Sequence, residues 1–152
     1  MMRNIKETKA QAIYYLIGKL ENIKNAYFAA SEKMKDEVLA LLLERFGYQR
    51  GRYSNELRQL VNQLGSSSPL DQTTLSLLHR TWTEMRTSFR FTKKEDLIQA
   101  CIRSDENALR NYNLVIEQIQ DNDEVKIILQ QQVNGIKTVL NTIKEYTGRT
   151  YS

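Results

Sequence analysis

The chain has 152 residues, of which 41% are hydrophobic and 26% charged, with 22 Lys and Arg against 18 Asp and Glu. This length is typical of one domain, and the apolar content excludes intrinsic disorder and fibrous repeats. One proline and six glycines are too few turn residues for an all-β fold. One cysteine and one histidine exclude disulfide scaffolds and metal sites built on several imidazoles.

The first predicted helix covers residues 5–31. Its apolar residues recur at spacings of three and four, which is typical of a helix with one buried face. They are Ile13, Leu16, Ile17, Leu20, Ile23, Tyr27 and Ala30.

The second predicted helix covers residues 37–64. The apolar spacing resumes there at Leu39, Leu42, Phe46, Gln49, Tyr53, Leu57, Leu60 and Leu64. The short connection between the first two helices makes them antiparallel neighbours. Gly47 and Gly51 lie one turn apart and indicate a close approach of a neighbouring helix or a kink.

A break follows at residues 66–69, where three serines precede the only proline. Beyond it, residues 73–90 predict a short amphipathic helix. Two further long helices are predicted at residues 94–120 and 123–147, the last ending before Gly148. Their apolar faces contain two polar residues, Asp105 and Gln132.

Four long amphipathic helices cannot bury their apolar faces separately, so we predict one all-α domain over residues 1–152. The long connection between the second and third long helices is typical of a ferritin-like four-helix bundle, with the short helix lying on its crossover.

A layer of polar side chains is predicted in the core of this bundle. A buried carboxylate is costly unless it is paired or hydrogen-bonded, so Asp105 needs partners from the other helices. We interpret the set as a hydrogen-bond network that fixes the register of the helices. Its members are Tyr27, Gln49, Tyr53, Glu56, Asp105, Tyr112 and Gln132.

The alternative for this layer is a carboxylate metal site, with Glu56, Asp105 and Gln132 as the best ligands. Di-iron sites in such bundles use two Glu-x-x-His motifs, and the chain contains none. The sequence therefore favours the hydrogen-bond network, and no metal or other cofactor is predicted.

The segment that contains the predicted crossover helix is basic, with five Lys and Arg and one Glu over residues 72–94. We interpret Trp82 as covering the edge of the bundle and His79 as an exposed or capping side chain. With Arg80 and Arg86, the same helix is the candidate for an alternative function, in which it binds an anionic membrane surface or a partner helix.

The amino terminus has no apolar signal region, and the longest apolar run is residues 38–43. We therefore expect a cytoplasmic protein without a transmembrane segment. A pI near 9.2 without an arginine-rich helix face is weak support for nucleic acid, which is not predicted as a partner.

Several strings together resemble a known family. They are Tyr27-x-x-Ala30-x-Glu32-x-x-Lys35-Asp36, Gln49-Arg50-x-x-Tyr53-x-x-Glu56-Leu57, Leu64-Gly65, Leu78-His79-Arg80-x-Trp82 and Cys101-x-Arg103-x-Asp105-Glu106-x-Ala108-Leu109. In this order they are similar to bacterial ferritin-like four-helix-bundle proteins catalogued as a domain of unknown function. The resemblance implies that fold in a bacterium and no agreed activity.

The functional hypothesis from the sequence is a non-enzymatic protein that acts through binding or assembly, as a homo-oligomer. The alternative from a different class is an iron or manganese protein with redox activity.

Overall fold

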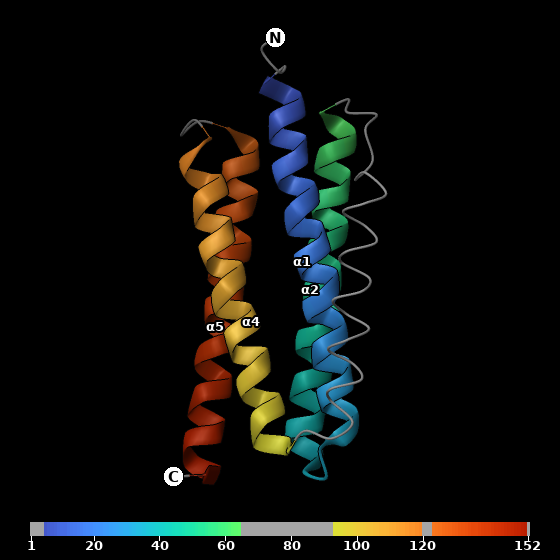
Figure 1. The fold of residues 1–152 in the computed structure, drawn as a ribbon, viewed down its shortest axis with the longest axis vertical. Helices are drawn as coiled ribbons and strands as arrows, with labels where there is room; N and C mark the ends of the chain where they lie inside the picture. Colours follow the sequence, from blue (N-terminus) through green and yellow to red (C-terminus); the bar gives the residue numbers. More distant parts are fainter. Residues whose placement is uncertain (1–4, 65–92, 120–122, 152) are drawn as a thin grey trace. The chain divides into compact units, whose positions relative to one another are not determined.

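The computed structural model describes residues 5–64, 93–119 and 123–151. Within these ranges the chain forms four α-helices and no strands (Figure 1): α1 (Ile5–Lys33), α2 (Glu37–Gln63), α4 (Lys94–Glu117) and α5 (Glu124–Tyr151). The all-α class with helix–helix packing is thereby confirmed. The predicted helix over residues 73–90 lies outside the described residues.

The chain divides into two compact units, and the division along the sequence falls between Ile98 and Gln99. The first contains α1 and α2, which lie side by side and antiparallel (Figure 1). Asp36 caps the start of α2, because its carboxylate accepts hydrogen bonds from the backbone N–H groups of Val38 at 3.0 Å and Leu39 at 3.2 Å. The connection between α1 and α2 is only three residues long and ends with this cap.

The second unit contains α5 and all but the first turn of α4, and these two helices are also antiparallel (Figure 1). Asp123 starts α5 by accepting a hydrogen bond from the backbone N–H of Val125 at 2.9 Å. At the other end α5 continues through Gly148 to Tyr151, four residues beyond the predicted end at residue 147. A glycine near a helix end lowers helix stability without ending the helix. No helix in the described ranges is long and apolar enough to cross a membrane.

The buried face of α1 is the one that its apolar periodicity predicts. All seven predicted residues are at most 3% exposed. They are Ile13, Leu16, Ile17, Leu20, Ile23, Tyr27 and Ala30.

The buried face of α2 is turned by one residue from the predicted one in the middle of the helix. Leu42, Phe46, Gln49 and Tyr53 are only half-buried. The buried positions are instead Leu43, Gly47, Arg50 and Ser54. Two of these positions, Gly47 and Ser54, are small and let α1 approach α2 closely, and hydropathy does not reveal them.

The two glycines of α2 mark this close approach, as one of the two sequence interpretations proposed. A Cβ atom added to Gly47 would lie 2.6 Å from Cε1 of the Phe28 ring on α1. At Gly51 the nearest atom of α1 is Cδ of Lys24, at 3.1 Å from the added Cβ. The Phe28 ring is in contact with the Tyr48 ring, whereas the Lys24 side chain is flexible.

We expect Gly47→Ala to lower the free energy of unfolding by about 1 kcal/mol. Alanine gains about 1 kcal/mol of helix propensity, but displacing the Phe28 ring costs about 2 kcal/mol. The matched control is Gly51→Ala, in which Lys24 can move, and this variant should be neutral or more stable by up to about 1 kcal/mol. Chemical denaturation measures both. A gain in stability at both positions would contradict the close packing of Phe28 on Gly47.

Candidate functional site

A polar cluster joins α1 to α2 around Glu21. Its carboxylate accepts a hydrogen bond from the hydroxyl of Ser54 on α2 at 2.8 Å and one from Lys24 on its own helix at 2.5 Å. The guanidinium of Arg58 lies 3.4 Å from the same carboxylate. Glu21 and Ser54 are 33 residues apart in sequence, and sequence reasoning did not select either of them.

The environment of Glu21 favours its charged form. Burial raises the pKa of this carboxyl, but the hydrogen bonds from Lys24 and Ser54 and the charges of Lys24 and Arg58 lower it by more. The net result is a pKa below the usual value of 4.5. The cluster is therefore a stabilising contact between two helices, with no group held in a reactive state.

This shift predicts how the stability of the protein depends on pH. A lowered pKa in the folded state adds stability above pH 4.5, and this stability is lost as the pH falls through the folded-state pKa. Glu21→Gln should lose about 1 kcal/mol of unfolding free energy at pH 7, discounted for the partial exposure of the group.

Denaturation curves of both proteins between pH 3 and pH 7 measure the effect, and the difference between them should shrink towards the acid end. The control is Glu106→Gln, which removes a more exposed ion pair with Lys144, at 3.7 Å, between α4 and α5. A difference for Glu21→Gln that is constant over this pH range would contradict the assigned role of the charge.

Arg50 is the largest fully buried side chain in the described residues, at 0% exposure. It donates a hydrogen bond to the side-chain carbonyl of Gln49. Its guanidinium carbon lies 5.6 Å from the centroid of the Tyr27 ring on α1. The Tyr27 ring also packs edge-on against Phe46 of α2, with centroids 5.9 Å apart. A buried arginine over an aromatic ring is a cation–π contact in low dielectric, where it is strongest.

The structure therefore brings three residues of one cluster together in the α1–α2 pair, namely Tyr27, Gln49 and Arg50. The sequence prediction contained the first two and missed Arg50. Arginine is almost never fully buried unless it is paired, so an arginine in a sequence is expected on the surface. Its position between Gly47 and Ser54, at spacings of three and four, was the available sign that it lies on a packed face.

In the α4–α5 pair, the hydroxyl of Tyr112 donates a hydrogen bond to the side-chain carbonyl of Gln132 at 2.6 Å. Both residues belong to the predicted polar layer, and both are buried, at 0% and 1% exposure. Asp105 is also 0% exposed, two helical turns before Tyr112 on α4. That all seven predicted residues form one layer stays a prediction.

Two other members of the predicted layer are only half-buried. Tyr53 and Glu56 lie on α2, on the side next to the buried face. Burial raises the pKa of the Tyr53 hydroxyl, with the charges of Arg50 and Arg52 opposing this and that of Glu56 adding to it. A pKa above the usual value of 10.0 means that the Tyr53 phenol is protonated at neutral pH and is not a phenolate there.

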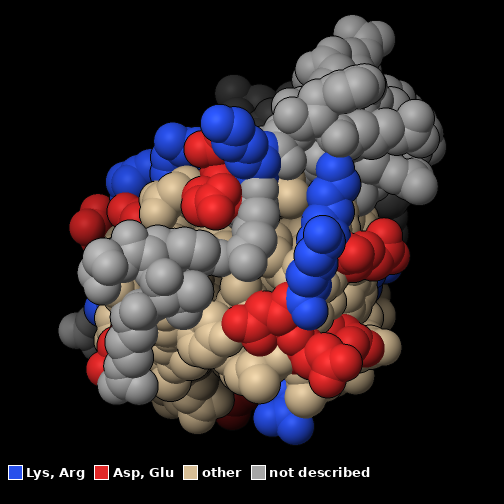
Figure 2. All heavy atoms as spheres, turned by 90° about the horizontal axis from the view of Figure 1, so that it is seen from below, with Lys and Arg blue, Asp and Glu red and all other residues tan. Residues whose placement is uncertain are grey.

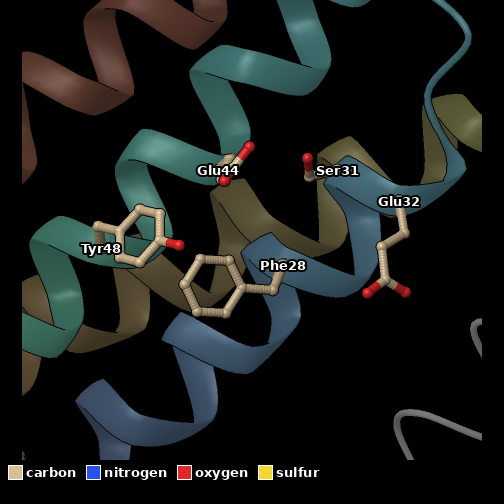
Figure 3. Close-up of a pocket in the computed structure, with 5 residues that line it drawn as sticks. All are labelled: Phe28, Ser31, Glu32, Glu44 and Tyr48. Carbon is tan, nitrogen blue, oxygen red and sulfur yellow. The ribbon is translucent and has the colours of Figure 1, made fainter.

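A surface hollow of about 390 Å³ lies between α1 and α2, near the turn that joins them. It is lined by Phe28, Ser31 and Glu32 of α1 and by Glu44 and Tyr48 of α2. Figure 3 shows the rings of Phe28 and Tyr48 next to each other, and their centroids are 5.1 Å apart in an edge-to-face contact. The hydroxyl of Ser31 donates to the backbone carbonyl of Ala40 at 2.7 Å. The hollow thus combines an aromatic wall with two carboxylates.

Next to this hollow, α2 exposes large apolar side chains along one face. Leu41 is 50% exposed and Tyr48 is 64% exposed, and Val38, at the start of the helix, is 60% exposed. Leu41 and Tyr48 are seven residues apart, so they lie on the same face of α2, about 10 Å from each other along its axis. We call Val38, Leu41 and Tyr48 the α2 strip.

Charges on the molecule are mixed in sign. Figure 2 shows one end, where Lys and Arg of the described residues lie beside Asp and Glu.

The residues of the predicted crossover surface, namely His79, Arg80, Trp82 and Arg86, lie outside the described residues. Among the described side chains, no group of three or more His, Cys, Asp or Glu is placed to hold a metal ion. Cys101 is fully buried in α4, as expected for a small core residue.

Comparison with protein-family models finds one match, described as a domain of unknown function (DUF2383), over residues 9–118. The match extends from the second turn of α1 to the end of α4 and includes the residues that connect α2 to α4. The chain belongs to this family. The predicted resemblance to a domain of unknown function is confirmed, and α5 lies beyond the residues of the match. No curated protein and no solved structure matches the chain.

Proposed function

We propose that the chain is a bacterial, cytoplasmic four-helix bundle of the ferritin-like type that acts without catalysis, by assembling into a homo-oligomer. Support for the bundle comes from four helices of similar length, between 24 and 29 residues, each with one apolar face. A fold of this kind does not by itself determine a function, so the argument depends on the side chains.

The buried polar groups support a structural role. Each of the contacts Glu21–Ser54 and Tyr112–Gln132 joins one helix to its neighbour. Among the described residues, every buried side-chain nitrogen or oxygen atom has a hydrogen-bond partner. Groups engaged in this way hold the helices in register.

The observation on which the proposal depends is the α2 strip. Three large apolar side chains exposed on one helix face are typical of a surface that another protein covers. Light scattering coupled to size-exclusion chromatography tests this proposal. We expect a mass above that of one 17.8 kDa chain, rising with protein concentration. A single-chain mass at every concentration would contradict the assembly.

The metal-binding alternative has its own test. Protein purified without chelators should contain no stoichiometric iron or manganese by elemental analysis. Stoichiometric metal that is lost in Asp105→Asn would support the carboxylate metal site in place of the hydrogen-bond network.

A further inference from the structure

Four charged residues lie on the same face of α2 as the α2 strip. Their order along the helix is such that an antiparallel copy of the helix would present opposite charges to them. Glu44 and Arg45 lie between Leu41 and Tyr48, and Glu37 and Arg52 lie one turn outside them. All of these side chains are exposed. They therefore share the outer face of α2 with the strip.

This order has a centre between residues 44 and 45. If a second α2 runs antiparallel with a twofold axis at that centre, each residue faces the one at equal distance on the other side. Leu41 then faces Tyr48 of the second copy, and Glu44 faces Arg45 of the second copy. Further out, Glu37 faces Arg52 of the second copy. Each of these four charged residues meets the opposite charge in this register, and Leu41 and Tyr48 meet each other.

From this pattern we infer that the outer face of α2 is a twofold, antiparallel contact with a second copy of the same chain. The inference rests on the proposed assembly and identifies its surface. A twofold contact is isologous, so one helix face must complement itself, which this sequence of charges does. Helices that cross at about 20° stay in contact over several turns, which is what these three kinds of pair, each formed twice, require.

The area of this surface limits the affinity that the contact can reach. Stable interfaces bury about 800 Å² on each partner, and four turns of one helix bury less than that. We therefore expect a weak dimer, with the apolar pair of Leu41 and Tyr48 giving most of the affinity and the charges setting the register. The hollow beside Tyr48 gives the facing Leu41 room to pack against the Phe28 and Tyr48 rings.

Charge reversal tests the twofold register directly. Glu44→Arg places two arginines opposite each other twice in the dimer, and Arg45→Glu does the same with two glutamates. Each single variant should raise the dissociation constant at least about tenfold, measured by sedimentation or light scattering of the full chain. The double variant Glu44→Arg with Arg45→Glu restores opposite charges and should restore dimerisation.

Mixing the two single variants gives a sharper test. The Glu44→Arg chain presents two positive charges at the centre and the Arg45→Glu chain two negative ones, so an equal mixture should dimerise although neither variant does alone. The control is Arg103→Glu, an exposed residue of α4 outside this face, which changes the net charge by the same amount and should leave the dissociation constant unchanged.

The failures of the two proposals are distinguishable. An oligomer that is unaffected by Glu44→Arg and by Arg45→Glu would overturn the α2 contact and leave the assembly in place. A wild-type chain that stays monomeric would overturn both. If in addition Leu41→Glu lowered the melting temperature of that monomer, the α2 strip would be covered by another part of the same chain.

Discussion

Arg50→Ala should lower the free energy of unfolding by about 3 to 4 kcal/mol, the largest effect expected for a single substitution in α2. The substitution leaves a cavity where the largest fully buried side chain lay. It also removes the donor to Gln49 and the cation above the Tyr27 ring. The lost hydrogen bond to the half-buried Gln49 accounts for a smaller part of the loss than the cavity does.

Arg50→Met separates packing from charge. Methionine fills most of the volume of the arginine stem and removes the guanidinium, so its loss in stability should be about half that of alanine. Arg52→Ala is the matched control, because Arg52 is exposed on the same helix two residues later, and it should change stability by less than about 0.5 kcal/mol. Equal effects of Arg50→Ala and Arg52→Ala in urea denaturation would contradict a buried role for Arg50.

Arg50 also shows where sequence reasoning fails. The periodicity of α1 predicts its buried face correctly because the buried positions are themselves apolar. In α2, the buried face between Leu43 and Leu57 consists of glycine, arginine and serine, which a hydrophobic pattern reads as a surface. The more apolar residues beside it, such as Phe46, then indicated a face turned by one residue. Two helices that pack closely need small residues at their contact, and hydropathy scales do not mark glycine or serine as buried.

Polar residues of the site were predictable to different degrees. Asp105 and Gln132 stand between apolar residues of their helices, so their burial followed from periodicity. The contact of Glu21 with Ser54 did not, because each residue alone is an ordinary polar residue of a helix, and only the packing of α1 on α2 brings them to 2.8 Å. The α2 strip was hidden for a different reason, since Leu41 belongs to an unbroken apolar run from Val38 to Leu43 that does not show which members are exposed.

The hydrogen bond between Tyr112 and Gln132 is expected to show strong coupling between its partners. Tyr112→Phe removes the donor and leaves the Gln132 carbonyl buried without it, at a cost of about 2 kcal/mol. Gln132→Met leaves the Tyr112 hydroxyl in the same position and should cost a similar amount. In the double variant both polar groups are gone and the shapes are nearly kept, so the loss should be smaller than the sum of the single losses by about 1 to 2 kcal/mol.

Urea denaturation of the four proteins gives this coupling energy from a double-mutant cycle. The control cycle uses Glu106→Gln and Lys144→Met, which removes an exposed pair between the same two helices and should give a coupling energy below about 0.5 kcal/mol. Additive losses at Tyr112 and Gln132 would contradict a direct bond between them. The two cycles join the same helices and differ mainly in exposure to water. Strong coupling between Tyr112 and Gln132 with weak coupling between Glu106 and Lys144 would therefore show that the buried polar contact stabilises the α4–α5 pair more than the exposed one does.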